Sequence, residues 1–182
     1  MNEVVVTSTD AVGNATSDAT TGELTLDTTD PVTPTVTAQT TNDTTPVLTG
    51  TAEANSTVTV VVGGATYEVT ATDPAGTWSV DTETATPVSG TFAPNVNGTN
   101  DVMVSSIDAA GNATSDATTG ELTLDTTDPV TPTVTAQTTN DTTPVLTGTA
   151  EANSTVTVVV GGATYEVIAT DPAGTWLSLI HI

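Results

Sequence analysis

The chain repeats itself with a period of 98 residues, and this period constrains its fold more than any other feature. The stretch from Gly13 to Trp78 returns from Gly111 to Trp176 with one difference, Thr70 against Ile168. Such a period is too long for a helical or leucine-rich solenoid, and it matches an independent domain of common size. The sequence therefore predicts tandem modules, each able to own a hydrophobic core.

The Asp-Pro steps of the repeat divide the chain into modules. They predict a partial copy at residues 1–30, a complete copy at 31–128 and a partial copy at 129–176. The first piece is expected to carry the last two strands and a linker, and the last piece only the early strands. Because Met1–Asn14 aligns with Thr99–Asn112, we expect the chain to begin inside a repeat, where Met1 need not be a start residue.

The register of the repeat is lost after Trp176. The sequence there reads LSLIHI, whereas the first copy continues as SVDTET. We interpret residues 177–182 as a non-native tail, the translation of a sequencing-library adapter, and leave it out of fold reasoning. The single histidine, His181, belongs to this tail and is assigned no role.

Charge is strongly one-sided, with 22 acidic residues, no Lys or Arg, and a formal net charge of −22. Nucleic acids and anionic membranes are bound through Lys and Arg, so both are disfavoured as partners and cations are favoured. The absence of Cys excludes disulfides and thiolate chemistry. The sequence shows no signal peptide and no apolar stretch of about 20 residues, so direct membrane insertion is not expected.

Strand patterns alternate with turn residues at short spacing, which is typical of an all-β sandwich. The abundance of Thr and Val favours strands over helices, and alternating runs such as VTVVVGGATYEV argue against disorder. We expect an Ig-like sandwich of about seven antiparallel strands in the complete module, with a two-residue hairpin turn at Gly63-Gly64. The expected strands are 32–38, 46–51, 57–62, 65–71, 77–81, 99–107 and 121–124, with mostly loop at 82–98 and a short strand near Phe92.

This strand order brings acidic loops together at the end of a module. If the first strand runs away from the preceding module, the turn at Glu53 and the loops at Asp73 and Asp108 return to its starting end. The preceding linker adds Asp27 and Asp30. Calcium takes six to eight oxygen ligands, so these acids are candidate Ca²⁺ ligands. The candidate set is Asp27, Asp30, Glu53 and Asp108, then Asp125, Asp128 and Glu151 at the next junction, with Asp10 as the equivalent of Asp108 in the first copy. Asp171 is the counterpart of Asp73 at that junction.

A role as turn formers and solvated charges is the alternative for these acids, because the chain contains no EF-hand spacing. Asn14 and Asn112, which each follow Gly, are expected to stabilise a tight loop through side-chain to backbone hydrogen bonds. Four further acids are expected to be plain surface residues: Asp43, Asp73, Asp81 and Asp116.

Catalysis is not expected of this module. The repeats contain no His, Cys, Lys or Arg, so they lack a general base tuned near neutral pH, and no pair of carboxylates is singled out for glycoside hydrolysis. Tyr67 and Trp78 are expected in the core, with Trp78 as its anchor. A sugar-stacking platform is the alternative for both rings.

Four motifs occur in order in the repeat, and together they carry a resemblance. They are the linker Leu26–Pro31, the segments Gly50–Glu53 and Ser56–Val58, the step Gly76–Trp78, and the loop Asp108–Asn112. Together they resemble the bacterial Ig-like repeats of large biofilm-associated and RTX-type surface adhesins, over all but the last six residues. The resemblance implies a β-sandwich, chains of many copies, Ca²⁺ held at junctions by linker and loop acids, and no catalysis. Where such linkers often carry a small apolar residue before Pro, this chain has Asp30 and Asp128.

Near-identity between copies favours a function carried by number and length, because a specific binding face usually sits in one distinctive module. The sequence therefore predicts a structural spacer or extender in the stalk of a bacterial cell-surface adhesin, outside the cell and rigidified by Ca²⁺ at its junctions. Its expected partners are neighbouring repeats, with host or matrix ligands bound only by other domains. The alternatives are an adhesin module that binds polysaccharide or a receptor, and a non-catalytic accessory module of a secreted enzyme.

Overall fold

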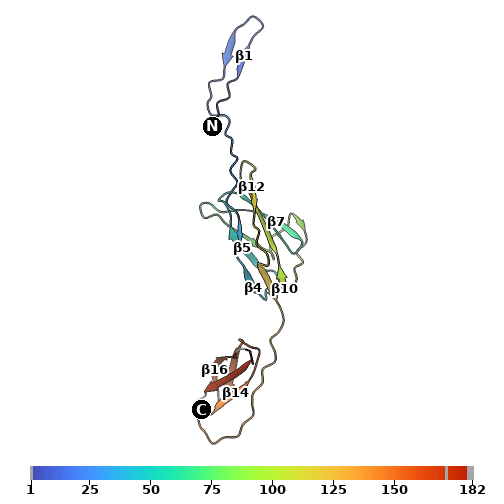
Figure 1. Ribbon diagram of the computed structural model, residues 1–182, viewed down its shortest axis with the longest axis vertical. Coiled ribbons are helices and arrows are strands. Elements are labelled where there is room, and N and C mark those ends of the chain that lie inside the picture. The colour runs from blue at the N-terminus through green and yellow to red at the C-terminus, as the bar shows by residue number, and fades with distance from the viewer. Residues whose placement is uncertain (1, 171, 180–182) are drawn as a thin grey trace. The chain divides into compact units, whose positions relative to one another are not determined.

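The computed structural model describes residues 2–170 and 172–179, and these residues are all-β. Strands, turns and loops account for the described part of the chain, which holds no helix long and apolar enough to cross a membrane. The chain divides into two compact units, Met1–Thr126 (unit 1) and Thr127–Ile182 (unit 2) (Figure 1). Met1, Asp171 and His181 lie outside the described residues.

Residues 31–126 of unit 1 form a β-sandwich, which confirms the predicted fold class. One layer is a five-stranded sheet in the order β12-β11-β6-β7-β9, and the sheets β3-β5-β8 and β10-β13-β4 pack their side chains with it into a single core. The strands are β3 (Thr35–Val36), β4 (Gln39–Thr41), β5 (Val47–Thr51), β6 (Thr57–Val62), β7 (Ala65–Thr70), β8 (Thr77–Asp81), β9 (Ser89–Gly90), β10 (Asn97–Asn100), β11 (Val102–Ile107), β12 (Ala113–Ser115) and β13 (Leu122–Asp125).

Two of the expected long strands are broken, because the chain changes partner strands along them. The strand expected at 32–38 is shortened to β3, which pairs with β5, and the chain then forms β4 beyond the expected range, where it pairs in parallel with β13. The strand expected at 99–107 breaks at Asp101 into β10, which pairs with β13, and β11, which pairs with β6. Strand β12 was not expected. The short strand expected near Phe92 lies earlier, as β9 at Ser89–Gly90. Phe92 itself is a half-buried loop residue packed against the core.

The β6–β7 hairpin has the predicted form. The two strands pair in register from Thr57↔Thr70 to Val62↔Ala65. Gly63 and Gly64 connect them with φ values of 54° and 83°. Both values lie in the left-handed region that a two-residue hairpin turn of this kind requires and that glycine adopts without a steric cost.

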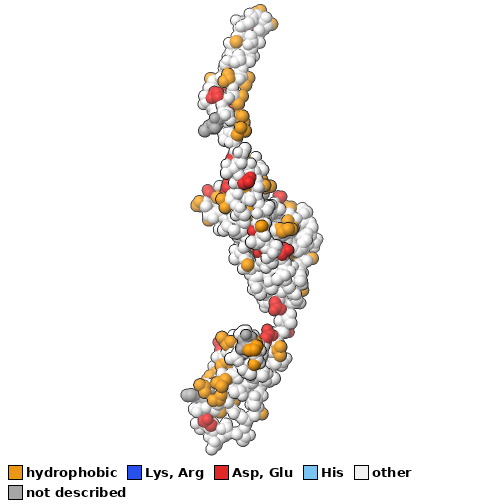
Figure 2. Space-filling model, in the orientation of Figure 1, with side chains coloured by type: hydrophobic (Ala, Val, Ile, Leu, Met, Phe, Trp, Pro, Cys, Tyr) orange, Lys and Arg blue, Asp and Glu red, His pale blue; other side chains and the backbone are white. Residues whose placement is uncertain are grey.

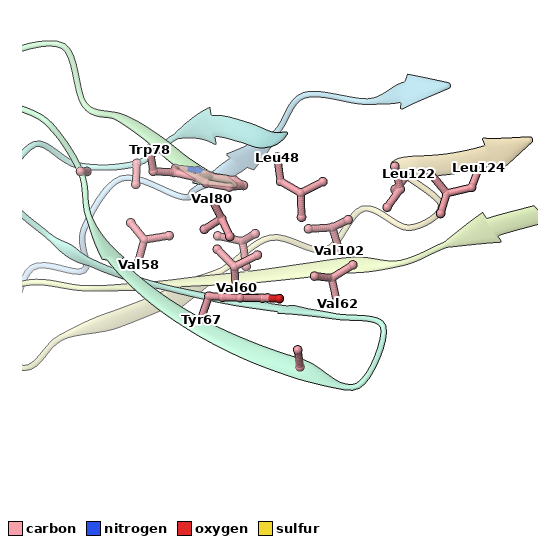
Figure 3. Packing of buried hydrophobic residues seen from close by; sticks show 14 residues of the cluster. Leu48, Val58, Val60, Val62, Tyr67, Trp78, Val80, Val102, Leu122 and Leu124 are labelled. Carbon is pink, nitrogen blue, oxygen red and sulfur yellow. The ribbon is translucent and has the colours of Figure 1, made fainter. Parts of the chain in front are cut away.

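The core lies between the inner faces of β5 and β8 and those of β6, β7 and β11 (Figure 3). Val58, Val60 and Val62 alternate inward along β6 and are at most 1% exposed. Leu48 and Val80 face them from β5 and β8, and each is 1% exposed. Alternation of buried and exposed residues along β5, β6 and β8 is the period-2 pattern of a strand with one buried face.

Trp78 is the core anchor that the sequence predicts. Its side chain is 2% exposed, and its Nε1 donates a hydrogen bond to the carbonyl oxygen of Thr35 at 3.1 Å. Tyr67 is also 2% exposed. Since both rings are buried, neither can serve as an exposed platform for stacking a sugar.

The partial modules form smaller assemblies. In unit 1, β1 (Thr7–Thr9) and β2 (Ala15–Ser17) make a hairpin. In unit 2, β14 (Val145–Thr149) pairs with β17 (Thr175–Leu179), and β15 (Thr155–Val160) pairs with β16 (Ala163–Ile168). Leu177–Leu179, part of the segment interpreted as a non-native tail, pairs with β14 in the register that Ser79–Asp81 has with β5.

Trp78 requires glycine at position 50, and this requirement can be tested. A Cβ atom added to Gly50 would lie 1.9 Å from the carbonyl oxygen of Thr35 and 2.6 Å from Cζ2 of Trp78. The substitution Gly50→Ala should therefore lower the free energy of unfolding by about 1–3 kcal/mol, the usual cost of overpacking. Urea unfolding followed by fluorescence in a Trp176→Phe background, where Trp78 alone reports, measures it.

The matched control is Thr49→Ala, on the exposed face of the same strand. It should change the free energy of unfolding by no more than about 0.5 kcal/mol. Equal effects of the two substitutions would show that the Trp78 ring tolerates a methyl group at position 50.

Candidate functional site

Loops of the sandwich gather at one end of residues 31–126, as the strand order predicts. The turn at Glu53 and the loop at Asp73 are joined by a hydrogen bond from the amide nitrogen of Ala52 to the carbonyl oxygen of Gly76, at 2.7 Å. The same turn meets the end of β11 through buried hydroxyl groups, since Ser106 Oγ donates to Ser56 Oγ at 2.9 Å. The Asp108 loop follows directly after β11.

Two side chains of the sandwich bind the backbone of the linker that precedes it. The amide nitrogen of Val32 donates to Glu53 Oε2 at 3.0 Å. Asn112 Nδ2 donates to the carbonyl oxygen of Asp27 at 3.2 Å. We call this pair of contacts the linker clasp, and it holds the linker at two points five residues apart.

Half of the linker clasp recurs in unit 2. There the amide nitrogen of Val130 donates to Glu151 Oε2 at 3.1 Å. Glu151 and Val130 occupy the positions of Glu53 and Val32 in the next copy of the repeat. The contact therefore belongs to the repeat, and the early strands of a module suffice to form it.

The Asp108 carboxylate is the organising group of its loop. Its Oδ1 accepts hydrogen bonds from the amide nitrogens of Ala110, Gly111 and Asn112, at 2.9, 2.7 and 2.9 Å. Its Oδ2 accepts from Asn112 Nδ2 at 2.8 Å. The Asn112 side chain, followed by the three amides, lowers the pKa of Asp108 below its usual value because these bonds favour the ionised form.

The same loop forms in the first partial copy. Asp10 Oδ1 accepts from the amide nitrogens of Val12 and Asn14, at 3.0 and 2.8 Å, and its Oδ2 accepts from Asn14 Nδ2 at 2.7 Å. The Asn14 side chain again makes the largest contribution to lowering the pKa of the aspartate. The loop is thus locally determined. Asn14 and Asn112 stabilise it by donating to the carboxylates of Asp10 and Asp108, and not through the bonds to the loop backbone that the sequence predicts.

The candidate calcium ligands do not come together as a cluster of three or more among the described residues. Asp27 Oδ1 accepts from the amide nitrogen of Thr29 at 3.0 Å, an ordinary Asx turn. The side chains of Asp30, Asp125 and Asp128 are exposed. Across residues 2–170 and 172–179, no three acidic or His side chains lie close enough together to hold a metal ion, and Asp171 lies outside this part.

Acids expected to be plain surface residues are partly or fully exposed, and three of them also shape turns. Asp43 Oδ1 accepts from the amide nitrogen of Thr45 at 2.9 Å, and Asp116 binds Thr118 in the same way at 3.2 Å. Asp81 accepts from the hydroxyl of Thr84, which lowers the pKa of Asp81. On the face shown in Figure 2, acidic side chains are spread over the surface.

Glu121 is a buried acid that sequence reasoning missed. Its side chain is 6% exposed, Oε2 accepts from the amide nitrogen of Val102 at 3.0 Å, and Oε1 has no hydrogen-bond partner among the described residues. The Glu121 side chain lies beside the break between β10 and β11, where it accepts the hydrogen bond from the Val102 amide. The alternation of Leu122 and Leu124 predicts an outward position for Glu121, because it assumes one continuous strand.

Comparison with known proteins finds likenesses among solved structures. No protein-family profile matches the chain, and no curated protein matches it either. Among solved structures, the chain is similar to the crystal structure of a tetra-tandem repeat in the extending region of a large adhesion protein, with a TM-score of 0.39 and 25% sequence identity. The match covers 97% of this chain and 47% of that one, so the chain spans about half the length of the protein it matches.

Asn112 controls the titration of Asp108, which gives a test of the loop. The substitution Asn112→Ala should raise the pKa of Asp108 toward its ordinary value of about 3.9, because the largest stabiliser of the carboxylate is removed. The folded-state pKa of Asp108 in the wild type lies below the unfolded value, so its stabilising effect is present above about pH 4 and is lost as the pH falls through the folded pKa. NMR titration of the carboxyl carbon measures both proteins.

Asp10 provides an internal control in the same sample. Its pKa should stay unchanged in Asn112→Ala, since its own partner is Asn14. An Asp108 titration that is the same in both proteins would contradict the assignment.

Proposed function

We propose that this chain is a structural spacer, in which repeats joined in series extend the stalk of a bacterial cell-surface adhesin outside the cell. The observation that carries the proposal is the linker clasp, because a sandwich that binds the linker before it restricts the angle between successive modules. Near-identity of the copies supports the same conclusion, since a spacer needs many equal units. The partners in this role are neighbouring repeats of the same chain.

The linker is stiffened by more than the clasp. Pro31 and Pro34 are buried against the sandwich, and a proline ring fixes its own φ near −65°. Proline also restricts the residue before it, which is Asp30, to extended conformations. Between the two anchored positions, Asp27 and Val32, Pro31 thus restricts its own φ and the conformation of Asp30.

The ligand-binding alternative requires an exposed aromatic or polar face. Tyr67 and Trp78 are each 2% exposed, so a carbohydrate site of that kind has no platform on the sandwich. A hollow of about 690 Å³ over β5 and β8 is open, and most of the residues that line it are threonines, with no charged side chain among them. We therefore place the function in the connection between modules.

Length scaling tests the spacer proposal. Arrays of two, four and eight copies of Pro31–Asp128 should show maximum dimensions in small-angle X-ray scattering that grow in proportion to copy number. Flexibly joined modules would grow roughly as the square root of copy number instead. Growth of the second kind would overturn the proposal.

The clasp itself is tested by removing both of its side chains. In the double variant Glu53→Ala with Asn112→Ala, the amide of Val32 should lose order, seen as a fall in its NMR order parameter from about 0.85 toward 0.6. The double variant Glu68→Ala with Asn42→Ala removes the same residue types from exposed positions and should leave the Val32 order parameter unchanged. An unchanged value in both variants would show that the clasp does not stiffen the linker.

Calcium stays a separate proposal for the same junctions. The described carboxylates are not assembled as a metal site, and Glu53 and Asp108 already accept hydrogen bonds from backbone amides. Support for an ion comes from charge: residues 31–128 contain twelve acids and no basic residue, so cations are the favoured counter-charge. No step of the stiffening described above depends on it.

Calorimetry with 1 mM CaCl₂ or with EDTA tests calcium binding in the 182-residue chain. Specific binding should raise the melting temperature, with about 2.7 kcal/mol of stabilisation at a hundred times Kd. The rise should be lost in the double variant Asp27→Asn with Asp30→Asn and kept in Asp43→Asn with Asp116→Asn. An unchanged melting temperature in the wild type would overturn the calcium proposal but would not affect the linker clasp.

A further inference from the structure

Two strands from opposite ends of the complete module, β4 and β13, lie side by side and run in the same direction. They pair in parallel, in register from Leu122↔Gln39 to Leu124↔Thr41. The amide nitrogen of Gln39 adds to this ladder, since it donates to the carbonyl oxygen of Glu121 at 2.8 Å. Every other strand pair within residues 31–126, all of which the structure describes, is antiparallel. The parallel pair therefore joins the beginning of the module to its end.

The chain enters the sandwich at one end and leaves it at the other. The linker arrives at the end that carries the Glu53 turn and the Asp108 loop, where the linker clasp lies. The chain continues from β10 through Asp101 into β11, which ends beside the Asp108 loop. Because β13 is antiparallel to β10, it runs away from this end, and β4 runs with it. Figure 1 shows the chain leaving the sandwich at the opposite end, where β4 and β10 are labelled.

Tension on the two linkers of a module therefore loads β4 and β13 in shear. Tension at the entry pulls β4 backward along its own axis, and tension at the exit pulls β13 forward along its axis. Because the strands are parallel, the two pulls slide one strand past the other and act on all the ladder hydrogen bonds together. Two strands pulled from the same end would instead separate one bond at a time. Forced unfolding is governed by the unfolding rate, and a step that must break several bonds at once is slower.

The entry side has less to resist tension before β4 is reached. Strand β3 has only two residue pairs with β5, Thr35↔Thr51 and Val36↔Gly50. The Gln39 side chain adds a bond behind it, because its Nε2 donates to the carbonyl oxygen of Val47 at 3.1 Å. Load that passes β3 therefore falls on β4 and on its ladder with β13.

Both ends of β13 are held by side chains of the same module. At its end, Asn97 Oδ1 accepts from the amide nitrogen and from the hydroxyl of Thr126, each at 2.9 Å. At its start, Asp101 Oδ1 accepts from the amide nitrogen of Gly120 at 2.8 Å. The buried Glu121 carboxylate binds an amide on the other side of the β10–β11 break. These bonds keep β13 in place between β10 and β4 as the load reaches it.

Burial protects the ladder on one face. Leu122 and Leu124 of β13 point into the core and are 0% and 1% exposed. A hydrogen bond in such low-dielectric surroundings is stronger than one in water. Water also cannot reach this face to replace a ladder bond as it stretches.

We propose that the β4–β13 pair is a load-bearing clamp, which resists unfolding of the sandwich when the chain is pulled through its linkers. Such a clamp adds resistance to tension to the length and stiffness of a spacer. The source of the tension rests on the proposed spacer role, whereas the resistance is a property of a single sandwich. It depends on the direction of pulling, which distinguishes it from the thermodynamic stability of the fold.

Single-molecule pulling in two directions tests the clamp in the 182-residue chain, where the absence of native Cys lets handles be attached at chosen residues. Thr29→Cys with Asp128→Cys loads β4 and β13 from opposite ends, in shear. Thr29→Cys with Thr119→Cys loads both strands from the same end, because Thr119 precedes β13. All three positions are exposed. At equal force, the unfolding rate should be at least about tenfold lower in the shear direction.

Two proline substitutions one residue apart locate the resistance. Gln39→Pro removes the amide that donates to Glu121. Thr40→Pro removes an amide that faces away from β13, since alternate residues of a parallel strand bond to a given neighbour, and β4 is an edge strand where proline is tolerated. Gln39→Pro should raise the unfolding rate at least about fivefold more in the shear direction than in the other direction. Thr40→Pro should change both rates equally.

Gln39→Ala completes the controls, because it keeps the amide and removes only the side-chain bond to Val47. It should behave like Thr40→Pro. A general loss of stability acts in both directions, so it cannot imitate the expected result. Equal unfolding rates of the wild type in the two directions, or equal effects of Gln39→Pro in both, would overturn the clamp. Neither result bears on the spacer proposal, which is decided by how the length of an array grows with copy number.

Discussion

Burial of the valine face of β6 is the interaction on which the rest of the sandwich depends. Strand β6 is flanked within its sheet by β7 and β11, and Leu48, Trp78 and Val80 of the opposite layer pack into the same core as its inward residues Val58, Val60 and Val62. The same residue types in unit 2 have only part of this cover, and they stay half-buried on an otherwise similar hairpin. Since hydrophobic stabilisation follows the apolar area removed from water, stability here comes from the covering strands more than from the hairpin itself.

Local sequence signals predicted the parts of the fold that are locally determined. The limits of β6 and β8 and the Gly63-Gly64 turn were predicted correctly, because each depends on residues within one hairpin or one turn. The breaks at Asp101 and after Val36 were not predicted, since they depend on which distant strand the chain pairs with next. The buried position of Glu121 follows from the same breaks, and alternation along a single strand does not reveal it.

The candidate site shows a similar division. Convergence of the loops followed from strand order, and a loop-forming role for Asn112 followed from its place after glycine. The positions of the carboxylate oxygens could not be predicted in this way, because the chain contains no Lys or Arg to pair with them. Asp27, Asp43, Asp81 and Asp108 instead accept bonds from nearby amide and hydroxyl groups, so each acid is directed by its own turn.

The linker clasp recognises main-chain atoms only, namely the amide of Val32 and the carbonyl of Asp27. Neither contact reads a side chain of the preceding module, so any module that ends in the same short linker is an acceptable neighbour. Recombination between near-identical gene segments can therefore insert or delete whole copies without creating a mismatched joint. Such an array would change in length by copy number alone, in steps of one module.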